Sequence, residues 1–281
     1  MVVIESVGIT DVGRKRKGNE DAFLLDDDSK LYVVADGMGG HQAGEVASTL
    51  VVETIRDHMK RFEKEGDVDG LADDDQILSK EASQLLSCIQ MANRGVHQAS
   101  CRNEMYRGMG TTVSAVYFSD ETLMAANVGD SPIYLVHDES IELLSVPHTV
   151  MAEQAALDPD GAERVGGQFR HMLTRAIGIE EKVKPDICEI QCFRGDILVI
   201  SSDGLSDKVS SEEILGVVKK EQPNRACRFL VDLANERGGD DNVTVIVLKI
   251  KKVRHGKGGI IGLISRIGQG LSSFPLKKIS K

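Results

Sequence analysis

The 281-residue sequence contains no tryptophan, and aromatic residues make up only 4% of it. Because 41% of the residues are hydrophobic, the chain is nevertheless long enough to bury a substantial core. That core must be mainly aliphatic, as in the apolar runs LYVVAD, DILVIS and VTVIVLKI, which are typical of buried strands. The composition indicates a globular, strand-rich protein that also contains helices.

The sequence also lacks the usual marks of membrane and secreted proteins. It has no apolar run of about 20 residues that could span a bilayer. The N-terminus reaches Glu5 without the basic region and apolar stretch of a signal peptide. The five cysteines are odd in number and form no CxxC pair, which favours reduced thiols over a disulfide framework. We therefore expect a cytoplasmic protein.

The net charge of −10 is unevenly distributed. Residues 251–281 carry eight of the 34 Lys and Arg and no acid, so the first 250 residues hold 26 basic residues against all 44 acids, a net charge of −18. Such an acidic body argues against nucleic acid as a substrate or partner, because binding to its backbone depends on basic side chains. It is compatible with a site that gathers carboxylates around cations.

Hydrophobic patterning predicts antiparallel strands with helices on their outer faces. Strands are expected at residues 2–10, 22–26, 31–36, 111–118, 122–128, 132–136, 141–144, 186–191, 196–201 and 243–250. Amphipathic helices are expected at residues 44–62, 76–101, 211–220 and 224–236. Short turns between consecutive strands indicate antiparallel pairing, and the helices need a sheet face to cover.

An acid recurs at the end of an apolar strand, beside glycine. Asp36 ends LYVVAD, Asp203 ends DILVISSD, and Asp130 and Asp241 follow NVG and GGD. One such acid is usually part of a turn. Four of them, together with Asn19-Glu20-Asp21 near the start, indicate a common site. Gathered carboxylates repel one another and raise their pKa values unless a cation compensates.

The types of these side chains indicate the chemistry. Carboxylates without clusters of His or Cys suit Mg²⁺ or Mn²⁺ better than Zn²⁺. Gly37 would let the main chain approach an ion closely. Two ions about 3.5–4 Å apart can activate a water, which best serves hydrolysis of a phosphate ester. In the basic cluster at residues 14–17, an arginine could hold the phosphate, whereas Lys15 and Lys17 fit a solvent-facing loop.

At these residues the sequence resembles the metal-dependent protein phosphatases of type 2C, in their bacterial form. The resemblance rests on D-x-G-x-x-R-x-x-N-E-D at residues 11–21, DGMGGHQAGE at 36–45, GMGTT at 108–112, NVGDSPIYL from 127, LTRAIG from 173, SDGLSD from 202 and GGDDNVTVIV from 238. It implies an α+β fold in which two central antiparallel β-sheets are sandwiched between layers of helices. Residues 1–250 would form the catalytic domain, and residues 251–281 a basic, amphipathic C-terminal tail.

The resemblance implies hydrolysis of phosphoserine and phosphothreonine on proteins by a hydroxide that bridges two Mg²⁺ or Mn²⁺ ions. Asp36 would bridge the two ions, and the Gly37 carbonyl would bind one of them. Asp203 and Asp241 would complete the second site. Glu20 would reach the first ion through water.

Two further roles follow from the resemblance. Asp130 would bind a third, weaker ion, together with Asp203, and Arg16 would bind the substrate phosphate. Many eukaryotic members carry a histidine after the Asp-Gly pair, but Met38 stands there in this sequence. His41 could instead be structural, so the general acid stays unassigned, with a metal-bound water as one candidate. Residues 149–170 correspond to a flap beside the site, and an inert surface connection is the alternative.

Two other functions remain open at this point. The fold could serve a pseudophosphatase that binds phosphoproteins without turnover, but the acids Glu20, Asp36, Asp203 and Asp241 are all present. A two-metal nuclease would also use carboxylates, but the acidic body counts against it. We expect a monomer whose partners are phosphorylated proteins.

The tail has a pattern of its own. Apolar residues recur every three or four positions, as on one face of a helix, at Ile260, Leu263, Ile264, Ile267, Leu271 and Phe274. Three glycines weaken the helix, because each costs about 1 kcal/mol relative to Ala. The segment could bind an anionic membrane or an acidic, apolar groove of a partner. It could equally be a solvated tail, or fold back on the acidic body.

Overall fold

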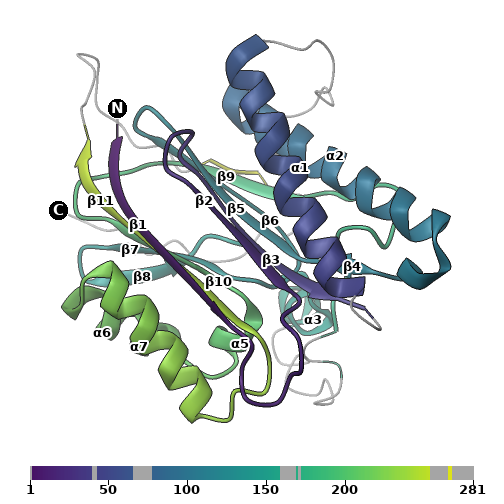
Figure 1. The fold of residues 1–281 in the computed structure, drawn as a ribbon. Coiled ribbons are helices and arrows are strands. Elements are labelled where there is room, and N and C mark those ends of the chain that lie inside the picture. Colours follow the sequence, from purple (N-terminus) through teal and green to yellow (C-terminus); the bar gives the residue numbers. More distant parts are fainter. Residues whose placement is uncertain are drawn as a thin grey trace.

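The computed structural model describes residues 2–39, 43–65, 78–158, 169, 172–253 and 265–267. Two antiparallel sheets lie at its centre (Figure 1). The five-stranded sheet has the order β1 (Val2–Asp11), β11 (Val243–Val253), β10 (Ile197–Ser201), β7 (Ile133–His137) and β8 (Ser140–Leu143). The seven-stranded sheet has the order β12 (Ser265–Ile267), β9 (Asp186–Gln191), β6 (Thr122–Val128), β5 (Val113–Ser119), β3 (Leu31–Met38) and β2 (Asp21–Asp26), with β4 (Gly110–Thr111) paired to β3.

Helices cover the outer faces of both sheets (Figure 1). The long helices α1 (Ala43–Glu65) and α2 (Lys80–Arg102) lie on the seven-stranded sheet. Helices α6 (Ser211–Lys220) and α7 (Pro223–Glu236) lie on the five-stranded sheet. Shorter elements are η1 (Glu104–Tyr106), α3 (Val150–Leu157) and α5 (Asp203–Ser206). The predicted α+β sandwich is confirmed.

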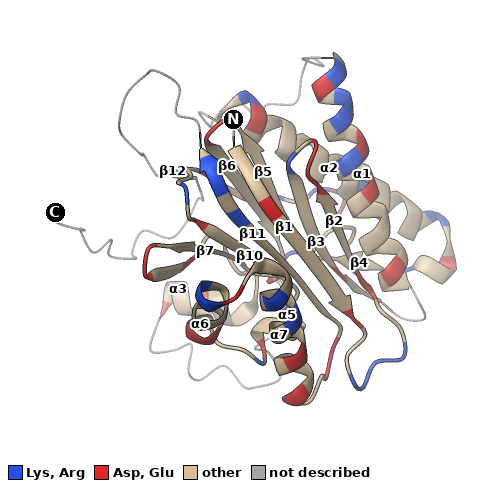
Figure 2. Cartoon of the chain, turned by 60° about the vertical axis from the view of Figure 1, so that its left-hand side comes forward, with Lys and Arg blue, Asp and Glu red and all other residues tan. Residues whose placement is uncertain are grey.

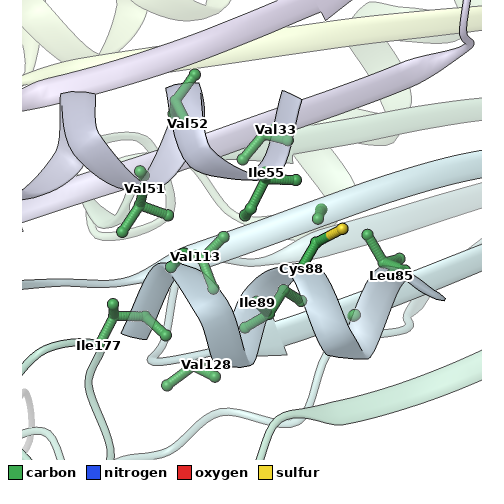
Figure 3. Packing of buried hydrophobic residues seen from close by; sticks show 14 of the residues in the cluster. Val33, Val51, Val52, Ile55, Leu85, Cys88, Ile89, Val113, Val128 and Ile177 are labelled. Atoms are coloured by element: carbon green, nitrogen blue, oxygen red, sulfur yellow. The ribbon is translucent and has the colours of Figure 1, made fainter. Parts of the chain in front are cut away.

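The central strands are apolar on both faces because they are buried on both sides of their sheets. In β3, Leu31 and Val33 pack beneath helices α1 and α2, whereas Tyr32 and Val34 pack between the two sheets. Figure 3 shows Val33 beside Ile55 of α1, within the first of these layers. The same alternation in β11 divides its side chains between the intersheet layer and the layer under α7. Continuous apolar runs therefore follow from the four-layer architecture.

Most predicted elements agree with the structure to within a few residues. The helix expected at residues 76–101 begins at Lys80, because Ser79 caps it by accepting a 3.1 Å hydrogen bond from the Ala82 N–H. Residues 66–77 lie outside the described part of the chain. Helix α3 was not expected, since it falls within the predicted flap. Within that flap, residues 159–168 and 170 lie outside the described part of the chain.

The C-terminal segment differs from the helical pattern at three residues. Residues 265–267 form strand β12, which pairs antiparallel with β9 at the edge of the seven-stranded sheet. An uncovered edge offers unpaired backbone groups, and glycines nearby disfavour a helix, so strand pairing is favoured there. Strand β11 continues to Val253, three residues past the expected domain boundary.

Two further observations concern the expected location of the protein. The five cysteines are free thiols, as the sequence predicted. Among the described residues, no helix combines the length and the apolar character that a membrane span requires.

Candidate active site

One cavity of about 840 Å³ opens at the end of the sandwich. All seven residues predicted for the site line it, namely Arg16, Glu20, Asp36, Gly37, Asp130, Asp203 and Asp241. They come from segments that are far apart in the sequence. The structure thus brings the whole predicted set together, although it tests none of the roles assigned to these residues.

Strand directions explain why these acids meet. Strands β3 and β6 both run antiparallel to β5, so their C-terminal ends, near Asp36 and Asp130, lie at the same end of the sheet. In the other sheet β10 runs antiparallel to β11. The residues after β10, including Asp203, therefore lie beside Asp241, which precedes β11. Antiparallel topology converts separate strand ends into one cluster.

Asn242 fixes the basic loop between β1 and β2 against this end of the sheets. Its side-chain NH₂ donates to the carbonyls of Val12 (2.8 Å) and Gly18 (2.9 Å), and its Oδ1 accepts from the Glu20 N–H (2.8 Å). Asn242 is buried, so these bonds hold the loop that carries Arg16 and Glu20. The sequence analysis did not single out this residue. Its signal was its place directly after Asp241.

The cavity acids strongly perturb one another. The pKa of Asp36 is raised well above its usual range by burial and by the charges of Asp21 and Asp203. A hydrogen bond between Asp36 and Asp203 acts in the same direction. Burial also raises the pKa of Glu20, although nearby Arg16 opposes this. The cluster therefore needs protons or bound cations to balance its charge.

Asp21 is an acid that the sequence analysis grouped with the others but gave no role of its own. It is paired with Asp36 across strands β2 and β3, and it is buried. Its Oδ2 accepts hydrogen bonds from the hydroxyls of Ser202 (2.8 Å) and Thr244 (2.7 Å), whereas Oδ1 has no partner among the described residues. Burial raises its pKa to about 7. Only its position beside Glu20 could have suggested this in advance.

The basic cluster at residues 14–17 lies in the loop joining β1 to β2 (Figure 2). Arg16 Nη2 donates to Asp241 Oδ2 over 2.7 Å, and this bond raises the pKa of the arginine. Half of the Arg16 side chain is exposed, so the guanidinium faces the cavity and solvent. Lys15 instead forms an ion pair with Asp240, which does not line the cavity.

The donor set fits hard divalent cations. It consists of carboxylates and the backbone at Gly37, where an added Cβ would come within 2.2 Å of the Gly44 carbonyl oxygen. Glycine is therefore required for this close approach. Within the described chain, no three His, Cys, Asp or Glu side chains are already arranged to hold an ion. Asp241 bonds Arg16 and Asp36 bonds Asp203, so ions would draw these carboxylates from their present partners.

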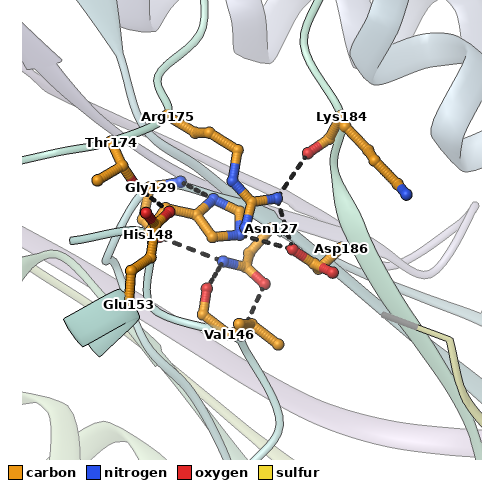
Figure 4. Close-up of polar contacts among 9 residues, drawn as sticks. All are labelled: Asn127, Gly129, Val146, His148, Glu153, Thr174, Arg175, Lys184 and Asp186. Carbon is orange, nitrogen blue, oxygen red and sulfur yellow. Dashed lines mark hydrogen bonds and ion pairs between the residues drawn. The ribbon is translucent and has the colours of Figure 1, made fainter. Parts of the chain in front are cut away.

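A polar network supports the opposite side of the cavity (Figure 4). The Gly129 N–H donates to His148 Nδ1 (3.0 Å), which places the imidazole proton on Nε2, 2.7 Å from Asp186 Oδ2. Burial lowers the pKa of His148, so the ring is neutral. Arg175 Nη1 donates to the same Asp186 oxygen over 2.7 Å. Despite burial, His148 and Arg175 lower the pKa of Asp186.

The fold and the carboxylate-lined cavity define a metal-dependent hydrolase.

Comparisons with known proteins agree with this assignment to the metal-dependent hydrolases. The family described as Protein phosphatase 2C matches residues 13–238. The putative protein phosphatase 2C-type of Streptococcus pyogenes is 34% identical over 245 residues, which cover 85% of this chain and 94% of that protein. The protein phosphatase PhpP of Streptococcus pneumoniae is 31% identical over 254 residues, which cover 87% of this chain and 96% of that protein.

Comparison with solved structures also finds similarity to serine/threonine phosphatases. The serine/threonine phosphatase PstP/Ppp of Mycobacterium tuberculosis superposes with a TM-score of 0.76 at 29% identity, covering 90% of this chain and all of that chain. A structure of the PstP catalytic domain in complex with two manganese ions gives a TM-score of 0.75 at 29% identity, with the same coverage. This chain belongs to the protein phosphatase 2C family. It is a metal-dependent serine/threonine phosphatase, its substrates are phosphoproteins, and its cofactor is Mg²⁺ or Mn²⁺.

Proposed function

We propose that the cavity acids hold two divalent ions for hydrolysis of phosphoserine and phosphothreonine. Asp36 would be shared by both ions, the Gly37 carbonyl would bind one, and Asp203 and Asp241 would bind the other. Glu20 acts through water. The observation that carries this assignment is that all of these residues line one cavity, where burial and like charges raise the pKa of Asp36. Asp130 and Asp203 would hold a third, more weakly bound ion.

The bound ions, when present, activate water and neutralise charge on the phosphate. Arg16 binds the phosphate. Its guanidinium faces the cavity and keeps its charge, because the hydrogen bond to Asp241 raises its pKa. Substrate binding would exchange this carboxylate for a phosphate, which arginine can hold through two parallel hydrogen bonds. No side chain is assigned as general acid, since Met38 cannot donate a proton and His41 lies outside the described residues.

Turnover of p-nitrophenyl phosphate tests the proposed chemistry. We expect hydrolysis that depends on Mn²⁺ or Mg²⁺, falls to background with a chelator and returns when either metal is added in excess. The same preparation should leave single- and double-stranded DNA and RNA intact. Metal-independent turnover would contradict the two-ion site. Phosphopeptide binding without any turnover would instead support the pseudophosphatase alternative.

We further propose that residues 1–250 act as a monomeric catalytic domain in the cytoplasm, and that the basic tail at residues 251–281 binds anionic membrane or a partner protein. The eight Lys and Arg of the tail support the anionic target. Pairing of β12 with β9 is compatible with the alternative in which the tail folds back on the body.

Deleting residues 255–281 should change hydrolysis of p-nitrophenyl phosphate by less than about twofold, because every described residue that lines the cavity precedes Asn242. The same deletion should remove binding to vesicles that contain anionic lipid, measured by co-sedimentation with neutral vesicles as the control. Equal vesicle binding by both proteins would contradict the membrane role. A large loss of turnover would place the tail within the catalytic domain.

A further inference from the structure

The cavity has two walls of opposite charge. The acids and Arg16 form one wall. The other is the loop of residues 173–184, which contributes to the cavity lining three basic side chains, Arg175, Lys182 and Lys184, and one acid, Glu180, whereas its second acid, Glu181, does not line the cavity. The body has a net charge of −18, so these basic side chains beside the catalytic cavity stand out against an acidic protein.

This loop is fixed at its base. Arg175 Nη1 donates to the Lys184 carbonyl over 3.1 Å as well as to Asp186, so its guanidinium joins the two ends of the loop (Figure 4). Ile177 exchanges two backbone hydrogen bonds with Thr111, of 2.9 and 3.1 Å. The positive charge of Arg175 is therefore committed to holding the loop together.

A buried asparagine fixes the middle of the loop. Asn93, on helix α2, donates to the carbonyls of Glu180 (3.1 Å) and Glu181 (3.0 Å) and accepts from the Gly178 N–H (2.8 Å). Its side chain is 1% exposed, so these bonds are protected from water. Gly178 has φ of +88°, and a Cβ there would lie 2.3 Å from Val96. The backbone of the loop is held in one shape that presents its side chains at the cavity.

The loop of residues 173–184 presents the positive charges of Lys182 and Lys184 at the cavity. Both are exposed, and neither side chain forms an ion pair or hydrogen bond with another described residue. Five other lysines form ion pairs with acids among the described residues, as Lys60 does with Asp26 and Lys251 with Glu5. A rigid loop thus holds two cations, unpaired within the described part of the chain, at the rim of the catalytic cavity.

We propose that Lys182 and Lys184 form a second anion-binding subsite, which selects phosphoproteins with negative charge beside the phosphorylated residue. The inference rests on the proposed function, in which the reacting phosphate lies at Arg16 and the carboxylates. A cavity of about 840 Å³ has room for more than one phosphate group. The neighbouring residues of the substrate then meet the lysine wall. Carboxylates and a second phosphate both carry negative charge on oxygen atoms, so this subsite would bind either group.

Steady-state kinetics on three phosphothreonine peptides tests the subsite, with Mn²⁺ present throughout. One peptide has neutral flanking residues, the second has Asp and Glu at the same positions, and the third has a second phosphate. We expect wild-type protein to favour both anionic peptides. The double variant Lys182→Ala/Lys184→Ala should lower the ratio of kcat/KM on anionic to neutral peptide by roughly three- to thirtyfold, as two exposed ion pairs permit. Comparing the second and third peptides shows whether carboxylate or phosphate is preferred.

The controls separate this proposal from simpler explanations. Lys220→Ala removes an exposed lysine that does not line the cavity, and it should keep the wild-type ratio. Lys182→Glu/Lys184→Glu should make the neutral peptide the better substrate. An equal fall on all peptides, with the ratio kept, would mean that the lysines only support the loop, and would overturn the proposal. A wild type without peptide preference would also overturn it. Absence of any metal-dependent turnover would instead overturn the proposed chemistry.

Discussion

Asp36→Asn should nearly abolish metal-dependent hydrolysis. The substitution keeps the size of the side chain but removes the negative charge that both ions are proposed to share. Loss of several kcal/mol of transition-state stabilisation corresponds to a fall in kcat of roughly 10³-fold or more. The measurement is turnover of p-nitrophenyl phosphate over a range of Mn²⁺ concentrations.

The fold should survive this change. In the metal-free protein, burial and the charges of Asp21 and Asp203 already disfavour ionised Asp36, so a neutral side chain is compatible with its surroundings. We expect the melting temperature with chelator to be at least that of wild type, and the stabilisation by added Mn²⁺ to be smaller. Asp28→Asn, at an exposed turn, is the matched control and should behave as wild type. Wild-type turnover by Asp36→Asn at limiting Mn²⁺ would refute the bridging assignment.

Arg16→Ala should mainly weaken substrate binding. A charge-assisted hydrogen bond contributes about 1.5–3 kcal/mol, so KM for a phosphopeptide should rise roughly ten- to hundredfold, with a smaller loss in kcat. Arg16→Lys should recover only part of the loss, because an ammonium keeps the charge but not the planar fork of donors.

Lys17→Ala is the matched control, since Lys17 lies exposed in the same loop and does not line the cavity. Its KM should stay at the wild-type value. If Arg16→Ala also leaves KM unchanged, the phosphate must be bound elsewhere, and Arg14 is the next candidate. A uniform fall in kcat with KM unchanged would instead indicate that Arg16 acts by positioning Asp241, to which it is bonded.

The layered fold could be predicted because each strand carries its own signal. The run LYVVAD is apolar at every position before its acid, which requires burial on both faces, and short turns require antiparallel neighbours. The same reasoning was weaker where the pattern was short. Helix α3 has no buried residue, so periodicity gave no sign of it. In the tail, apolar spacing suggested a helix, whereas residues 265–267 pair with the edge of β9.

The acids of the candidate site were predictable from the sequence, but their surroundings were not. The sequence by itself determined which acids stand at strand ends, and hence that carboxylates and cations dominate the chemistry. Only the tertiary structure decided how deeply they are buried and what supports them. Asn242 bonds Glu20 across 222 positions of the chain, and Asn93 reaches Glu180 across 87. Local sequence patterns extend over a few residues, so contacts between distant segments become visible only when folding brings their strands and helices together.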